Sequence, residues 1–149
     1  MTQIMICSDS HGSKARIDKL FENYKFDYFI FLGDGLTDLG NWELLDNVYA
    51  VSGNCDFFSV VESERMLEIA GKHIFITHGH KYGVKYGLAT LSKYARNYGA
   101  DIVLYGHTHN YNVEDIDGVT FANPGTLKGD SAMMLTINGK KVNFERIVL

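Results

Sequence analysis

Short apolar runs alternate with amphipathic segments in the first half of the chain. Residues 4–7, 28–32 and 48–51 are each four or five consecutive apolar residues, and runs of this length between turn residues indicate buried strands. The segment after the first run carries apolar residues at helical spacing, namely Ile17, Leu20, Phe21 and Tyr24. This alternation predicts parallel strands joined by crossover helices.

Small polar residues mark two predicted helix starts. Ser13 directly precedes the first amphipathic segment and is a residue type that caps helices. A second, short helix is expected over residues 36–45, with Thr37 or Asp38 near its start. In this interpretation Asp38 is a helix cap.

The second half of the chain has the pattern of a mixed sheet. Glycine-containing turns separate its apolar runs, which is the signal for hairpins. The predicted elements, in order, are strands at 61–69 and 73–77 joined by a turn at 70–72, a helix at 87–98 stopped by Gly99, a strand at 102–105, and two hairpins with type I′ turns at Asp117-Gly118 and Asn138-Gly139. The whole order favours an α/β (α+β) fold: a four-layer β-sandwich of two mixed sheets flanked by helices.

Length and composition agree with one globular domain over residues 1–149. A chain of this size buries roughly 68–70% of its unfolded surface, enough for a substantial core. Hydrophobic residues make up 46% of the sequence and charged residues 21%, which is not a disordered composition. The net charge of −4 argues against binding along duplex nucleic acid, which needs a basic surface. A small phosphate ester held by metal ions remains compatible with that charge.

Compartment signals in the sequence favour the cytoplasm. The two cysteines, Cys7 and Cys55, have no disulfide or zinc-site spacing. No apolar run approaches the ~18 residues of a membrane span, and the N-terminal residues do not resemble a secretory signal. We therefore expect a reduced, cytoplasmic protein without a membrane association.

Polar residues with metal-binding side chains follow the predicted strands. Side chains two apart on an extended backbone point to the same side, so His107 and His109 are expected to aim at a common place beyond a strand end. In open α/β sheets ligands bind at that edge. The set of such strand-end residues is Asp9, His11, Asp34, Asn54, His78, His107 and His109.

Each of these residues also has a simpler interpretation. A lone His-x-His pair is more often solvated than metal-bound, and Asp34 between two glycines is typical of a turn. However, five of the six histidines lie in strand-end loops, and only His73 lies inside a strand. A random scatter would not place them this way. The oxygen and nitrogen donors suit two divalent ions such as Mn²⁺, Fe²⁺, Ni²⁺ or Zn²⁺.

Taken in order, these motifs resemble the calcineurin-like metallophosphoesterases, and within them the small phosphodiesterases of the YfcE type. The resemblance covers about three quarters of the chain. The matching motifs are Asp9-x-His11, Gly33-Asp34, Gly53-Asn54-Cys55-Asp56, Thr77-His78-Gly79-His80, Gly106-His107-Thr108-His109 and, with Thr in place of Ser, Asn123-Pro124-Gly125-Thr126.

The resemblance implies a two-metal centre. One metal ion would be held by Asp9, His11 and His109. The other would be held by Asn54, His78 and His107, with Asp34 bridging the two. Mn²⁺ is the metal we expect. The implied reaction is hydrolysis of a phosphodiester by a metal-bridging hydroxide, without a covalent protein nucleophile.

Asp34, Asn54, His80 and Cys55 are the predicted catalytic residues. Many relatives have His where this chain has Cys55, and that His is thought to assist the leaving group. A thiol carries no positive charge at neutral pH, so we expect a preference for diesters or activated leaving groups over unactivated monoesters. His80 is the candidate for the missing proton donor, although it is equally suited to orient a neighbouring residue.

Other functions and partners stay open at this point. A phosphomonoesterase or protein phosphatase is one alternative, and a non-catalytic scaffold like the retromer subunit Vps29 is another. The expected substrate is a small phosphodiester or a nucleotide-like compound. Phe57, Phe58 and residues 81–86 either contact it or lie in a solvated loop at a subunit contact, and the second is favoured. The aromatic content of 13% makes a homodimer a further expectation.

Overall fold

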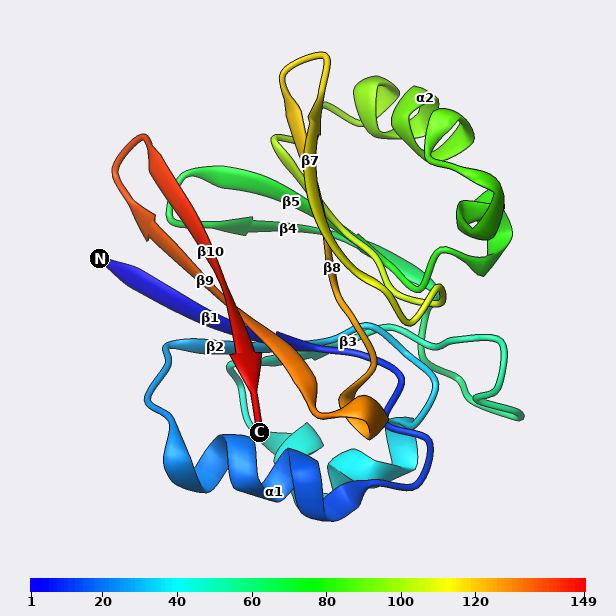
Figure 1. Ribbon diagram of the computed structural model, residues 1–149, viewed down its shortest axis with the longest axis vertical. Coiled ribbons are helices and arrows are strands. Elements are labelled where there is room, and N and C mark those ends of the chain that lie inside the picture. The colour runs from blue at the N-terminus through cyan, green and yellow to red at the C-terminus, as the bar shows by residue number, and fades with distance from the viewer.

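Two five-stranded sheets pack face to face, with helices on both outer faces (Figure 1). The computed structural model describes residues 1–149. The strands are β1 (Thr2–Cys7), β2 (Tyr28–Phe31), β3 (Val48–Ala50), β4 (Glu64–Ile69), β5 (Lys72–Thr77), β6 (Ile102–Leu104), β7 (Tyr111–Ile116), β8 (Val119–Pro124), β9 (Ser131–Asn138) and β10 (Lys141–Val148). This architecture confirms the predicted four-layer sandwich.

The first sheet has the order β10-β9-β1-β2-β3. Its strands β1, β2 and β3 are parallel, whereas β9 and β10 run antiparallel to their neighbours. Two helical segments connect the parallel strands, α1 (Lys14–Asn23) and the 3₁₀ segment η1 (Leu36–Leu44). Both cover the outer face of this sheet, where the ring of Phe21 stacks on Trp42 with centroids 4.2 Å apart.

The second sheet has the order β4-β5-β6-β8-β7. Strands β5, β6 and β8 are parallel, and the β4 and β7 edges are antiparallel. Its outer face is covered by α2 (Ala89–Asn97) and by two short 3₁₀ turns, η2 (His80–Tyr82) and η3 (Val84–Tyr86). No helix is long and apolar enough to cross a bilayer.

The pleat of each strand divides its side chains between two cores. Ile4 and Ile6 of β1 face the opposite sheet, and Met5 and Cys7 face α1 and η1. The inter-sheet core is built largely from Ile and Leu, each of which contributes about 1.5–3 kcal/mol when fully buried. The apolar runs seen in the sequence are continuous because both faces of these strands are covered.

Several predicted local features differ in the structure. The helix expected at 36–45 consists of two 3₁₀ pieces, because Gly40 between them has non-helical angles (φ 53°, ψ −132°). Ser13 occupies the N-cap position of α1, but its hydroxyl accepts a hydrogen bond from Arg16 and does not cap the helix. Asp38 likewise does not cap η1 and instead accepts hydrogen bonds from the loop after β1.

One strand boundary and one turn also differ from the positions predicted from the sequence. The strand expected at 61–69 begins at Glu64. The Asp117-Gly118 turn has positive φ at both residues, as type I′ requires. The last hairpin turns at Gly139-Lys140, one residue later than predicted, because Asn138 is the final ladder residue and pairs with Lys141. Only Gly139 has positive φ there.

Candidate metal centre

The strand-end residues meet where the carboxyl ends of parallel strands from both sheets converge. The first sheet supplies side chains after β1, β2 and β3, and the second supplies them after β5 and β6. In chain order they are Asp9, His11, Asp34, Asn54, His78, His107 and His109. Asp9, Asp34 and His78 are buried, whereas His109 and Asn54 are exposed, so the centre opens to solvent on one side.

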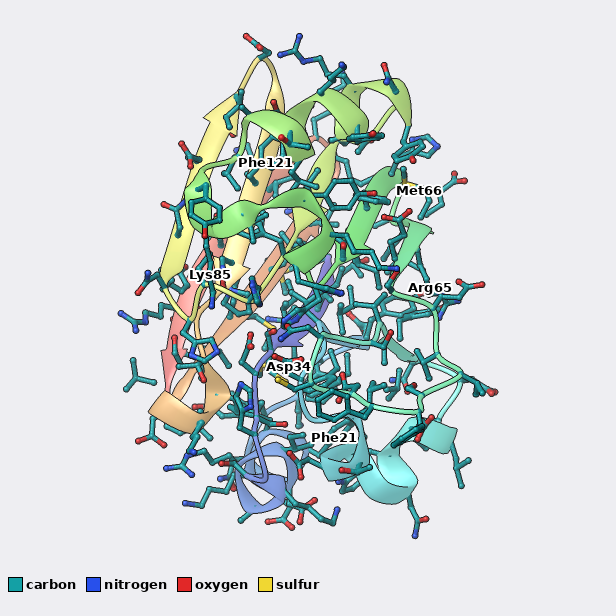
Figure 2. The ribbon with its side chains drawn as sticks, turned by 90° about the vertical axis from the view of Figure 1, so that its right-hand side faces the viewer. Phe21, Asp34, Arg65, Met66, Lys85 and Phe121 are labelled. Atoms are coloured by element: carbon teal, nitrogen blue, oxygen red, sulfur yellow. The ribbon has the colours of Figure 1, made fainter.

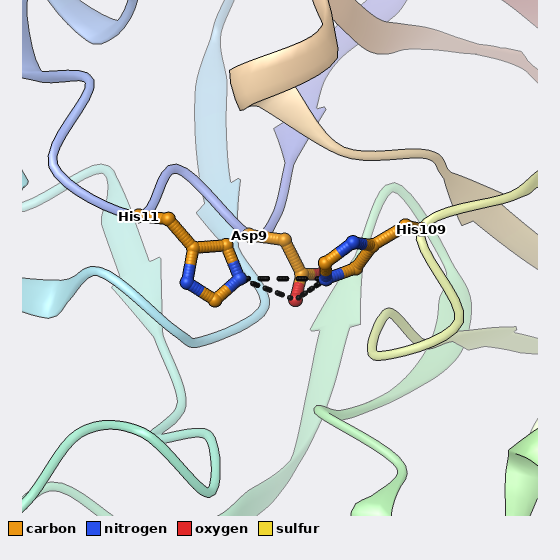
Figure 3. Close-up of side chains that lie close together, drawn as sticks. All are labelled: Asp9, His11 and His109. Carbon is orange, nitrogen blue, oxygen red and sulfur yellow. Dashed lines mark hydrogen bonds and ion pairs between the residues drawn. The ribbon is translucent and has the colours of Figure 1, made fainter.

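Asp9, His11 and His109 form one compact group (Figure 3). The Nε2 atom of His109 lies 3.1 Å from Oδ1 of Asp9, and Nε2 of His11 lies 3.5 Å from the same oxygen. The two Nε2 atoms are 3.4 Å apart. One carboxylate oxygen and two imidazole nitrogens therefore face a common point.

Asp34, His78 and His107 form a second group. The Nε2 atom of His78 lies 3.3 Å from Oδ2 of Asp34 and 3.2 Å from Nδ1 of His107. On the other side of its ring, Nδ1 of His78 donates to the carbonyl of Leu32 at 2.7 Å. That hydrogen bond turns Nε2 toward the group and fixes the tautomer of the neutral ring.

The two groups are neighbours, and Asp34 lies between them. Oδ2 of Asp34 is 3.3 Å from His78 in its own group and 3.9 Å from Nε2 of His11 in the other. His78 is in turn 3.9 Å from Oδ1 of Asp9. Asp34 is thus the carboxylate placed to contact both positions.

Each carboxylate keeps one oxygen for the chain and presents the other to the centre. Oδ2 of Asp9 accepts hydrogen bonds from the Ser8 hydroxyl at 2.6 Å and from the His107 amide at 3.1 Å. Oδ1 of Asp34 accepts one from the Cys55 amide at 2.8 Å. These contacts fix the orientation of the free oxygens.

The electrostatics of the centre suit a cation. Burial raises the pKa of Asp34, but hydrogen bonds from His78 and Cys55 and the charges of His78 and His11 hold that pKa well below its usual range. Burial lowers the pKa of His78, but its hydrogen bond to Asp34 and the charges of Asp9 and Asp34 outweigh this and raise it. Histidines are the only basic side chains that pair with Asp9 or Asp34.

Five centre residues have a left-handed backbone: Asp9 (φ 55°), His11 (φ 42°), Asp34 (φ 63°), His107 (φ 70°) and His109 (φ 65°). The expectation that His107 and His109 lie on an extended backbone and aim at one place was therefore wrong. The chain turns sharply at each residue, so His109 joins the group of Asp9 and His107 joins the group of Asp34. Strained backbone of this kind clusters at functional sites.

Two glycines permit the close packing of these loops. A β-carbon at Gly53 would lie 2.1 Å from Oδ1 of Asp34. One at Gly106 would lie 2.2 Å from the Ser8 hydroxyl and 2.9 Å from Oδ2 of Asp9. Both separations are far inside van der Waals contact, so only glycine fits at these positions.

Supporting residues behind the centre were missed in the sequence. The carboxylate of Asp56 accepts hydrogen bonds from the amides of Gly53, Asp34, Gly35 and Leu36 at 2.7–3.0 Å. Three of these four amides lie about 20 residues earlier in the chain, so no local sequence signal identifies this role of Asp56.

The Asn123-Pro124-Gly125-Thr126 loop supports two other loops of the centre. The side chain of Asn123 donates to the Gly106 carbonyl and the Thr108 hydroxyl. The Thr126 hydroxyl donates to the carbonyl of Asp9 at 2.8 Å. The sequence gives no indication of these contacts beyond the family motif.

The remaining predicted residues border the two groups. Asn54 is exposed, and its side-chain amide donates to Sγ of Cys55 at 3.5 Å. Sγ of Cys55 lies in a third cluster with His11 and Asp34. The ring of His80 lies 5.5 Å from His78 and 6.2 Å from His107, and its Nδ1 atom is buried without a hydrogen-bond partner.

The donor set fits divalent metal ions. Each of the two groups offers a carboxylate oxygen and two imidazole nitrogens, with all ligand atoms within 4.8 Å of one another. These donors match Mn²⁺, Fe²⁺, Ni²⁺ and Zn²⁺. Buried carboxylates need a positive partner, and no lysine or arginine supplies one here.

The sequence profile of the calcineurin-like phosphoesterase superfamily domain matches residues 2–139. The chain belongs to this superfamily. This phosphoesterase is 30% identical to the probable metallophosphoesterase YsnB of Bacillus subtilis over 84% of its own length and 75% of that protein. It is 29% identical to the phosphodiesterase MJ0936 of Methanocaldococcus jannaschii over 99% of both chains.

Solved structures of other proteins share the fold of this phosphoesterase. A predicted phosphoesterase from Streptococcus pneumoniae superposes with a TM-score of 0.88 and 25% identity, covering 99% of this chain and 89% of that one. Vps29 from Entamoeba histolytica superposes with a TM-score of 0.79 and 21% identity over 99% of both chains. The second likeness concerns the fold alone.

Proposed function

We propose that this chain is a metal-dependent phosphodiesterase with two metal positions. Asp9, His11 and His109 would hold one ion. Asn54, His78 and His107 would hold the other, with Asp34 contacting both. The observation that carries the proposal is that the two ligand groups are adjacent and that the Asp34 carboxylate lies between them.

Metal ions bound at these positions would polarise the phosphoryl oxygens and activate water for attack at phosphorus. The protein itself contributes by orienting the side chains that would bind the metal ions. The Leu32 carbonyl holds His78, and the Ser8 hydroxyl holds Asp9. No serine or threonine side chain is needed as a nucleophile in this proposal.

His80 and Cys55 are the candidates for delivering a proton to the leaving oxygen. Burial and the charges of His78 and Lys81 lower the pKa of His80, so its ring is neutral at physiological pH. Burial and the charge of Asp34 raise the pKa of the Cys55 thiol, which therefore stays protonated. Neither residue brings a positive charge toward an alkoxide, which supports a preference for diesters or activated leaving groups.

That preference has a direct check. Rates on alkyl phosphate monoesters and aryl phosphodiesters would be compared on the same enzyme and metal. Equal rates on the two classes would contradict the roles given to His80 and Cys55 and would favour the phosphomonoesterase alternative.

The main test is metal add-back on metal-stripped protein with an aryl phosphodiester, beside Asp34→Asn. Activity should return with divalent metal, most strongly with Mn²⁺ among Mn²⁺, Ni²⁺, Zn²⁺ and Mg²⁺. Asp34→Asn should lower it by more than about 100-fold, since even groups that only orient a ligand are worth about 10–100-fold. Bound metal without any turnover would instead favour the scaffold function.

The charge and composition of the chain support an expected class of substrate. The net charge of −4 supports a small phosphodiester or nucleotide-like substrate over duplex nucleic acid. Cytoplasmic location and homodimer formation are kept as predictions.

A further inference from the structure

A groove of about 630 Å³ opens directly beside the metal centre. It runs between η1 and the loop that follows β3, and it shares His11, Asp34 and Cys55 with the centre. Its volume is in the range of small-molecule sites, which is about 300–1,000 Å³. A phosphate ester placed at the centre can therefore extend one of its ester groups into this groove.

The outer wall of the groove is an apolar loop that projects into solvent. In Figure 1 the segment between β3 and β4 extends away from the two sheets. Phe57 is 77% exposed, and Phe58 and Val60 are almost wholly exposed. Leu36, which is mostly buried, also lines the groove. Large apolar side chains gathered at one exposed place mark a binding surface.

The backbone of this loop is strained at the aromatic residue. Phe58 has a φ of 61°, a left-handed conformation that bulky residues disfavour and glycine adopts freely. Among the residues other than glycine with positive φ, Phe58 alone has a large apolar side chain. Five of the others are the centre residues Asp9, His11, Asp34, His107 and His109. A strained, exposed phenylalanine beside the centre is consistent with a functional use of its ring.

The charges around the groove disfavour a second phosphate as its occupant. No lysine or arginine lines it. Asp38 and Asp56 line it, but their carboxylates already accept hydrogen bonds from within the chain. Glu43 and Thr37 also line it, and their exposed side chains are available to a ligand.

Two lysines near the centre lie outside the lining of the groove. Lys81 and Lys85 belong to η2 and η3, and their charges act on His80 and His107. In Figure 2, Lys85 and the loop after β3 lie on opposite sides of Asp34. The groove side of the centre is thus the apolar side, and it suits an uncharged group.

We propose that this groove is the subsite for an uncharged, flat ester group of the substrate, an aromatic ring or a nucleobase. Phe57 and Phe58 stack on its face, and Glu43 and Thr37 bind its polar edge. The inference rests on the proposed function, because the phosphate must sit at the metal centre. It reverses the preference drawn from the sequence, which placed these aromatics at a subunit contact.

The test measures binding of phosphonates and a nucleotide to the Mn²⁺-loaded protein by calorimetry. Phenylphosphonate and thymidine 5′-monophosphate carry a flat group, and methylphosphonate does not. The double variant Phe57→Ala/Phe58→Ala should weaken the two flat ligands by roughly 5–150-fold, the usual effect of losing base–aromatic stacking. Methylphosphonate should bind it as it binds the unchanged protein.

Tyr86→Ala is the matched control, because Tyr86 is an aromatic residue that is 96% exposed but lies outside the groove. It should leave all three affinities unchanged. An unchanged melting temperature of the double variant verifies folding. Equal losses for all three ligands, or no loss for any, would overturn the groove assignment.

Turnover of an aryl phosphodiester by the unchanged protein is recorded separately. If turnover is present and the flat ligands lose nothing in the double variant, the groove assignment fails and the proposed function stands. If turnover is absent and the double variant loses affinity only for the flat ligands, the groove assignment stands and the proposed function fails.

Discussion

At the scale of single residues, the centre is held in a backbone conformation that its side chains do not favour. A left-handed backbone costs an L-residue about 1–2 kcal/mol, and His109 has a φ of 65° with a side chain that is 46% exposed. Its strain is therefore little offset by packing. The other four left-handed residues of the centre have the same backbone cost, but Asp9 and Asp34 are buried and hydrogen-bonded, which offsets part of it.

Comparing glycine with alanine at His109 tests this strain. In metal-free protein, His109→Gly should be more stable than His109→Ala by about 0.5–1 kcal/mol, because glycine has no β-carbon to crowd the backbone. Urea unfolding gives both free energies. His73, in strand β5 and without positive φ, is the control. There the order should invert, with glycine less stable by about 0.5–1 kcal/mol. The same order at both positions would contradict the strain argument.

At the scale of elements, the loops after β2 and β3 behave as one unit because Asp56 joins them. Its carboxylate binds the amides of Asp34, Gly35 and Leu36 in one loop and of Gly53 in the other. These hydrogen bonds position the loop that carries Asp34, although the Asp56 carboxylate contacts only backbone amides and none of the histidine rings of the centre.

Asp56→Asn should loosen that unit. Each oxygen of Asp56 accepts two hydrogen bonds from backbone amides. Asparagine keeps one acceptor oxygen, so two of these hydrogen bonds are lost and the free energy of unfolding should fall by about 1–3 kcal/mol. Activity and Mn²⁺ affinity should fall about 10–100-fold, as for residues that orient ligands. Asp46, which is exposed and makes no hydrogen bond, provides Asp46→Asn as the control. A loss of stability with unchanged metal affinity would show that Asp56 does not position the ligands.

Element order and the candidate ligands could be predicted from the sequence, because both leave local signals. Buried strands are visible as apolar runs, and the ligands stand at strand ends. The backbone at His107 and the contacts of Asp56 could not be predicted, because each depends on loops distant in the chain. The prediction of one helix at 36–45 was wrong for a more local reason, because the non-helical angles of Gly40 divide this segment into two 3₁₀ pieces.

At the scale of the whole molecule, the metal centre joins the two sheets. Asp9, His11 and Asp34 follow strands of the first sheet, and His78, His107 and His109 follow strands of the second. Ions bound between them would link the halves of the sandwich, and ligands that bind only the folded state stabilise it.

Metal removal should therefore lower the melting temperature. At a metal concentration about 1,000 times the dissociation constant, binding adds about 4 kcal/mol. For a chain of this size that corresponds to roughly 10 °C. Calorimetry with Mn²⁺ and with a chelator measures the difference. His78→Ala should abolish most of it, and His73→Ala, outside the centre, should retain it. An equal shift in both variants would place the stabilising ions elsewhere.

The left-handed backbone of the centre also bears on how such a chain changes over generations. Mutation of the exposed His109 to glycine relieves strain, so such a change raises the stability of the metal-free chain unless selection for the reaction opposes it. A lineage retained only for binding another protein would lose its histidines without harm to its fold. This sequence has histidine at positions 11, 107 and 109, which agrees with the metal-dependent function proposed above.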